Sequence, residues 1–137
     1  MAKKKEILAI ADEDNYKIIK SFEDACKKFK LNPKDLPDVS NLPEQFKKPV
    51  IAAYKLMIIY KAINGKWEAD WKKPKSNDDY KSKYLPCFSM YDFESSSALS
   101  IAIGRFSFMG NHLCTSTKEK SEYIGKQFKK EFEELFF

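Results

Sequence analysis

The first part of the chain repeats apolar positions with the period of a helix. Ser21 to Asp24 resembles a capping box in which Asp takes the place of the preferred Glu. The apolar residues that follow would share one helix face: Phe22, Ala25, Cys26 and Phe29. Asn32-Pro33 predicts the end of this helix. Residues 6–20, before the cap, fit either short strands or part of a longer helix.

A longer helix is predicted in the middle of the chain. Residues 31–42 carry prolines and turn-forming residues, so they predict an irregular connection. Pro43 suits the first turn of a helix, and Pro49 predicts a kink or a second start. From Val50 to Ile63 the chain is apolar nearly all round, which is typical of a helix buried at the centre of a domain. Asn64-Gly65 predicts its end.

Beyond Gly65 the pattern changes to the period of a strand. About three strands are predicted, namely Trp67 to Trp71, Tyr84 to Phe93, and a segment in which Leu99, Ile101 and Ile103 alternate with small residues. The segment from Glu94 to Ser97 is expected to be a loop. A change of phase at Gly104-Arg105 predicts a β-bulge or the end of the strand.

One amphipathic helix is predicted at the C-terminal end. Ser116 and Glu119 form a second capping box. The stripe behind it comprises Ile124, Phe128, Phe132, Leu135 and Phe136. The fold class expected is α+β, with helices first, a buried central helix among them, and then a small antiparallel sheet covered by this last helix. The length favours a single domain, residues 1–137, with residues 1–5 as a solvated basic tail.

Composition narrows the class of protein. The net charge of +5 permits binding to anions without requiring it. Three cysteines without a C-x-x-C spacing argue against a disulfide framework and favour the reducing cytoplasm. Apolar runs are too short to cross a bilayer, so no membrane partner is expected.

No enzyme, cofactor or metal site is expected from the motifs. His112 and Cys114 give one weak ligand pair, and Cys26 and Cys87 are far from it in sequence, where they are interpreted as small buried apolar residues. A thiol–imidazole pair between Cys87 or Cys114 and His112 has no accompanying signature, and His112 is expected in a loop or at the surface. Carboxylate pairs lie in polar runs, and the four glycines are scattered.

The candidate binding surface is a run of aromatic residues interleaved with basic ones. Rings of this kind stack on the bases of single-stranded nucleic acid while lysines follow its phosphates, in a sequence-tolerant and salt-dependent way. The alternative, which the pattern favours for any single ring, is that the rings form the core and the lysines a solvated rim. The candidate nucleic-acid-binding residues are Trp67, Trp71, Lys72, Lys73, Lys75, Lys81, Lys83, Tyr84 and Arg105.

Three segments of the chain resemble a known family. They are Phe22 to Cys26 with Leu36 to Ser40, then Ile51 to Trp67 leading to Asp70-Trp71, and finally Leu113-Cys114 with Tyr123 to Phe128. Over residues 21–134 the chain is similar to a family of short, functionally unassigned proteins of gut bacteriophages and prophage-bearing host genomes. The resemblance implies a phage-type origin and no activity.

The chain departs from that family at two places. Cys87 stands where the family tends to have an aromatic residue, and Gly110-Asn111-His112 stands where it tends to have Gly-Ser-Arg. An anion-binding role for that arginine is therefore not carried over.

Two functional hypotheses follow. The first is a non-enzymatic accessory protein that binds nucleic acid, single-stranded above all, through the aromatic and basic residues. The second is a virion component or an effector that docks onto a phage or host protein. Both place the chain in the cytoplasm of a bacterial host, or in a virion.

Overall fold

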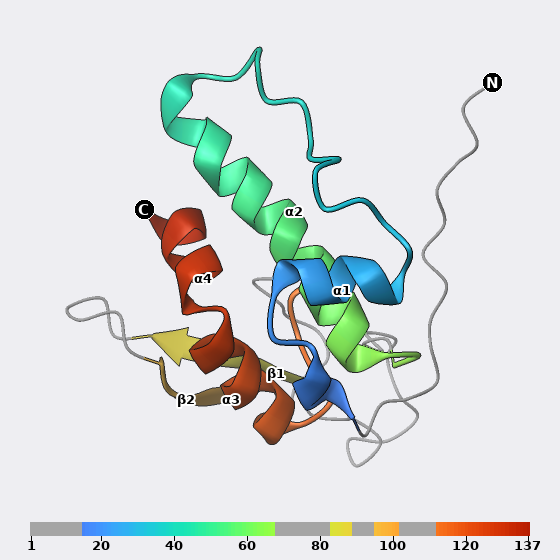
Figure 1. Ribbon diagram of the computed structural model, residues 1–137. Helices are drawn as coiled ribbons and strands as arrows, with labels where there is room; N and C mark the ends of the chain where they lie inside the picture. The colour runs from blue at the N-terminus through green and yellow to red at the C-terminus, as the bar shows by residue number, and fades with distance from the viewer. Residues whose placement is uncertain (1–14, 68–82, 89–94, 102–111) are drawn as a thin grey trace, which may run out of the picture.

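The computed structural model describes residues 15–67, 83–88, 95–101 and 112–137, and these are mainly helical (Figure 1). Helices outnumber strands in these ranges, and the only regular strand pairing within them is one antiparallel ribbon. The elements in chain order are η1 (Tyr16–Ile18), α1 (Phe22–Lys28), α2 (Glu44–Asn64), β1 (Lys83–Phe88), β2 (Ser95–Ile101), α3 (Lys118–Gln127) and α4 (Lys129–Phe136).

Helix α1 begins as the sequence predicts and ends earlier. The Ser21 hydroxyl accepts a hydrogen bond from the Asp24 backbone N–H at 3.1 Å, which confirms the predicted N-cap. At the other end, Lys30 has a φ of 55°, and the Leu31 N–H donates to the Cys26 carbonyl at 2.9 Å. This left-handed residue and the bond that spans it form a Schellman motif. The turn ends the helix before Asn32-Pro33.

Helix α2 runs without interruption through Pro49, so this proline neither ends nor restarts it. Pro43 is the N-cap, one residue before its predicted place in the first turn. Gly65 ends the helix as predicted, with a φ of 63°, a ψ of −124°, and its N–H donating to the Lys61 carbonyl at 3.1 Å. A Cβ opposes that combination of angles. Within the described ranges, no helix is long and apolar enough to cross a membrane.

The core forms around the second half of α2. Its most buried face carries Ala52, Leu56, Ile59 and Ile63, each with an exposed fraction of 0%. Helix α1 packs on one side of α2 and α4 on another (Figure 1). The predicted buried central helix is thus present. Other members of the core are Ile19, Phe22, Ala25, Cys26, Leu113, Ile124, Phe128 and Phe132.

The sheet is smaller in the described residues than the sequence predicts. Strands β1 and β2 pair in antiparallel fashion, from Lys83 opposite Ile101 to Phe88 opposite Ser95, with an irregularity before Phe88. The backbone of Tyr84 also exchanges two hydrogen bonds with Thr115, so β1 has a partner on each edge. Strand β2 includes residues 95–97, which the sequence analysis expects to be a loop. Residues 68–71 and 104–108 lie outside the described ranges.

The C-terminal stripe is divided between two helices, where a single helix is predicted. Phe128 separates α3 from α4, with φ and ψ of −112° and 31°. Helix α3 packs on β1 and β2, whereas α4 packs on α2. The turn at Phe128 is what lets one continuous apolar stripe follow two surfaces of different direction. The N-cap of α3 is Thr117, one residue after the predicted Ser116.

Side chains of α3 hold the segment from Tyr16 to Lys20 against the body of the protein. The Tyr123 hydroxyl donates to the Ile19 carbonyl at 2.6 Å, and the Gln127 amide donates to the Lys20 carbonyl at 2.9 Å. The Tyr16 ring lies edge-on to Tyr123, with 5.4 Å between centroids. These contacts tie the start of the described chain to its C-terminal part.

We expect Tyr123→Phe to lower the free energy of unfolding by about 1–3 kcal/mol, because it leaves a partly buried carbonyl without its donor. Tyr54→Phe is the matched control. The Tyr54 ring packs on Phe22 at 6.3 Å and its hydroxyl takes part in no described hydrogen bond, so a change below about 0.5 kcal/mol is expected. Urea unfolding followed by circular dichroism measures both, and equal losses would contradict this role of the hydroxyl.

Candidate functional site

Three of the predicted nucleic-acid-binding residues lie in the described ranges, and one of them is buried. Trp67 and Tyr84 are half-buried, so their rings are neither core residues nor fully open stacking surfaces. Lys83 has an exposed fraction of 1%. Because neighbouring residues of a strand point to opposite faces, Lys83 points inward while Tyr84 points toward the rim. Lys83 is therefore corrected from a phosphate-binding lysine to an interior one.

The other predicted binding residues lie outside the described ranges and stay a prediction. They are Trp71, Lys72, Lys73, Lys75, Lys81 and Arg105. Among the described residues, therefore, the structure does not assemble the aromatic and basic surface that the sequence suggests.

Lys83 belongs to a buried polar cluster at the C-terminal end of α2, which we define as Tyr60, Asn64, Lys83 and Cys114. The Asn64 side-chain amide donates to the Cys114 carbonyl at 2.8 Å, joining the helix to the segment before α3. The Tyr60 hydroxyl and Asn64 Oδ1 are buried without a hydrogen-bond partner in the described chain. Unpaired buried polar atoms of this kind are uncommon and costly. The cluster thus places polar groups inside the protein at the end of α2.

The chemistry of this cluster is that of a protonated thiol. Burial raises the pKa of Cys114 to about 11, and the nearby Lys83 ammonium offsets only part of that effect. Burial also raises the pKa of Tyr60, and the proximity of Cys114 adds to the rise. A nucleophilic or metal-binding cysteine needs a lowered pKa. The raised pKa disfavours the thiolate that a nucleophilic role requires. The described residues hold no group of three or more potential metal ligands.

The remaining cysteines and the histidine divide between interior and surface. Cys26 is buried, as expected, and burial raises the pKa of its thiol. Cys87 is exposed, which corrects its interpretation as a buried apolar residue. His112 is exposed, in agreement with its expected place at the surface.

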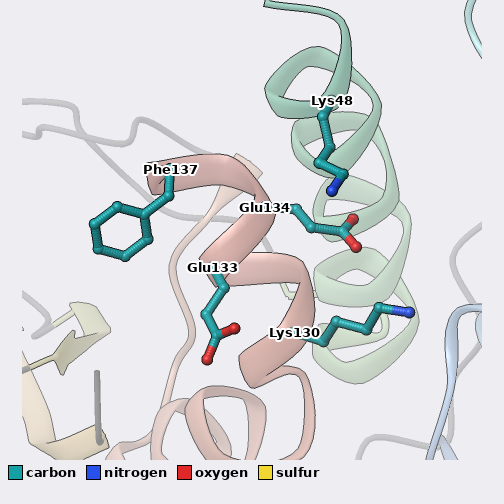
Figure 2. A pocket seen from close by; sticks show the side chains of 5 residues that line it. All are labelled: Lys48, Lys130, Glu133, Glu134 and Phe137. Carbon is teal, nitrogen blue, oxygen red and sulfur yellow. The ribbon is translucent and has the colours of Figure 1, made fainter. Parts of the chain in front are cut away.

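A shallow groove of about 380 Å³ lies between α4 and the first half of α2. Figure 2 shows Lys48 reaching down from α2 toward Glu134 of α4, with Lys130 and Glu133 below it and the Phe137 ring turned outward. The groove thus carries two cations and two anions. This balanced charge makes it a poor site for a strongly charged ligand.

Glu131, on the same helix, carries a perturbed carboxyl group. Burial raises the pKa of Glu131 above its ordinary value of 4.5, and the charge of Glu134 acts in the same direction. Lys55 and Lys130 oppose this shift. Because the folded pKa is raised, the carboxyl stabilises the fold most when it is protonated.

An apolar stripe faces solvent on the first half of α2, and we define it as Phe46, Val50, Ala53 and Met57. The three larger side chains have exposed fractions of 52%, 39% and 37%. The four residues of the stripe follow one another at intervals of four, three and four positions. They therefore form a narrow row about 120° around the helix from the buried face. Figure 1 shows this half of α2 extending beyond α1, with α4 along one side. The stripe is the main apolar surface of α2 that the fold leaves exposed.

A long irregular connection, residues 29–43, joins α1 to α2. Connections longer than about 12–15 residues without helix or strand are uncommon and often functional. This one is ordered by its own turns, in which Asn32 Oδ1 and Asp38 Oδ1 each accept a backbone N–H at 3.0 Å. Accepting the hydrogen bonds of Ser40 lowers the pKa of Asp38. The connection also exposes Leu36 and Leu42.

Sequence reasoning missed the stripe because α2 is apolar nearly all round. A helix of that kind is expected to be covered on every side, so no face is singled out. The usable signal was the row at 46, 50, 53 and 57, which repeats the spacing of the buried row at 52, 56, 59 and 63. Two such rows on one helix indicate two packing surfaces.

Comparisons of the sequence with protein-family models, curated proteins and solved structures find no match. The resemblance to the phage family therefore stays a prediction.

We expect one of the three thiols to react rapidly with Ellman's reagent in the native protein at pH 8. Cys87 is exposed, whereas Cys26 and Cys114 are buried with raised pKa values. The substitution Cys87→Ser should abolish the rapid reaction, and denaturant should release the other two thiols. Rapid reaction of the Cys87→Ser variant would contradict the burial of Cys114.

We expect Glu131→Gln to be more stable than the natural protein at pH 7, with a gain that disappears as the pH falls toward 4.5. Ionisation of a half-buried carboxyl with a raised pKa costs stability as the pH rises. Solvent screening keeps the gain below about 1 kcal/mol. Urea unfolding between pH 4 and 8 measures the gain, and the exposed Glu133→Gln serves as control. A gain independent of pH would contradict this origin.

Proposed function

We propose that this protein is a non-enzymatic accessory protein that docks onto a phage or host protein through the apolar stripe of α2. The observation that carries the proposal is the exposure of Phe46, Val50 and Met57 in one row along a helix. Apolar side chains scattered singly over a surface are ordinary, whereas a contiguous apolar patch marks an interaction site.

Leu36 and Leu42 add two exposed apolar side chains shortly before the stripe in the sequence. In the described part of the chain, five of the eight large apolar residues that are exposed fall within residues 36–57. They are Leu36, Leu42, Phe46, Val50 and Met57. They come from two consecutive pieces of chain, the long connection and the first half of α2. Burial of these side chains by a partner would contribute a favourable free energy of about 25 cal/mol for each Å² of apolar surface removed from water.

The proposal favours a protein partner over nucleic acid. Single-stranded nucleic acid needs rings with basic side chains free to reach its phosphates, and the interior position of Lys83 removes one of these. The stripe itself offers aliphatic side chains and one phenyl ring, which suit the apolar face of another protein. We also propose the α+β fold with about three strands that the sequence predicts. Residues 68–82 and 102–111, which include parts of the predicted strands, lie outside the described ranges.

The triple substitution Phe46→Gln, Val50→Gln and Met57→Gln is expected to leave the free energy of unfolding within about 1 kcal/mol of the natural value, because these exposed side chains contribute little to the fold. Leu56→Gln, on the buried face of the same helix, is expected to cost more than about 3 kcal/mol.

The function itself is tested by a photo-crosslinking residue at position 50. The control carries it at Ile18, which is 54% exposed and belongs to η1, outside the stripe. In the bacterial host, position 50 should give a protein adduct that position 18 does not. The adduct is identified by mass spectrometry, and the purified partner is titrated against the natural protein and the triple variant. Affinity that the triple variant retains would contradict the proposal. Crosslinks to nucleic acid alone would contradict it as well.

A further inference from the structure

We infer that the segment of the partner that occupies the apolar stripe is an acidic amphipathic α-helix of another protein. This inference rests on the proposed function and adds to it the shape and the charge of the partner. Shape and charge are read from different features of α2.

The shape follows from the spacing of the stripe. Rows at intervals of four, three and four residues are the a and d positions of a helix-to-helix seam. The row from Phe46 to Met57 is roughly 16 Å long, about three turns of a partner helix laid beside it. The small Ala53 lies at the middle of the row, where it allows the partner backbone to approach closely. A helix presents its own side chains at the same intervals of three and four residues, whereas an extended segment repeats one face at every second residue, about 7 Å apart.

The charge follows from the residues around the stripe. Residues 29–61 hold six lysines and three acidic residues, although Lys48 and Lys55 lie on the side of α2 toward α4. Lys47 and Lys61 are two heptads apart, with Tyr54 midway, so all three line the same flank of the stripe. This lysine flank calls for carboxylates on the partner.

Lys47 is available to such a partner. Its ammonium lies 2.9 Å from a carboxylate oxygen of Glu44, in an ion pair whose acidic member is 88% exposed. Surface pairs of this kind contribute little to stability, so a carboxylate of the partner exchanges with Glu44 at small cost.

A second copy of this chain is a poorer occupant. A symmetric pair of α2 helices would bring two copies of the flank with Lys47 and Lys61 onto one interface, where like charges repel. The row is also shorter than the three to four heptads typical of a coiled coil that forms by apolar contacts alone. Opposite charge on the partner compensates for both deficits.

The test begins with a phage-display library of 18-residue peptides. Their fixed positions hold residues of high helix propensity, and their variable positions hold apolar, acidic or basic residues at random. The library is selected on the full-length natural protein and counter-selected on the double variant Val50→Asp and Met57→Asp. The sequences expected to survive carry apolar residues at intervals of three and four, with Glu or Asp beside them. Circular dichroism of each variant establishes that it is folded.

Selected peptides are then made with a fluorescent label and titrated by anisotropy, each beside a copy in which every acidic residue is Lys. The acidic copy is expected to bind about tenfold tighter. The variant Lys47→Glu and Lys61→Glu should reverse this preference. The variant Lys118→Glu and Lys126→Glu has the same net charge and alters exposed positions of α3, so it should leave the preference in place.

The outcomes separate this inference from the proposed function. If the selected peptides are basic or non-helical and lose binding in the variant Val50→Asp and Met57→Asp, the inference of an acidic helix is wrong. Docking through the stripe would then still hold. Sedimentation that shows a dimer lost in the variant Val50→Asp and Met57→Asp would overturn it in favour of a second copy. If no selected peptide depends on the stripe, both the acidic helix and docking through the stripe are wrong.

Discussion

The need to cover α2 governs the arrangement of the described elements. A helix of 21 residues with apolar side chains on most of its circumference is unstable in water until other elements pack on it. Helix α1 packs on one side of α2, and α4 packs on another and reaches Lys48 in its first half. Phe128 and Ile124 extend the same core through α3. The hydrogen bonds from Tyr123 and Gln127 to the Tyr16–Lys20 segment then hold the two ends of the described chain together.

The cover is shorter than the helix, and this mismatch is the origin of the proposed binding surface. The first half of α2 extends beyond α1, and the long connection between them supplies turns and exposed leucines in place of another packed helix. An uncovered apolar row costs free energy in the isolated protein, and a partner recovers it on binding. The lysines beside the row do not drive that recovery. They select which apolar helix is accepted.

At the covered end of α2 the interior has a different character. Tyr60, Asn64 and Cys114 meet there with Lys83, and two of the polar atoms involved have no described partner. The low polarity around them keeps the Cys114 thiol protonated, which makes the cluster a structural feature of the interior without an activated nucleophile. One helix thus carries a polar buried end and an apolar exposed one, the reverse of the usual distribution.

The sequence by itself determined the features that depend on neighbours along the chain. The Ser21 cap and the end of α2 at Gly65 both follow from local hydrogen bonding and backbone angles. The presence of a buried central helix was likewise visible. Only the tertiary structure decided that Lys83 is interior, that Cys87 is exposed, that the last helix turns at Phe128, and that the row at Phe46 is left open. The physical reason is that periodicity shows which side chains share a face, while burial depends on which face a distant segment covers. For α2, which is apolar nearly all round, that choice is invisible until the packing is known.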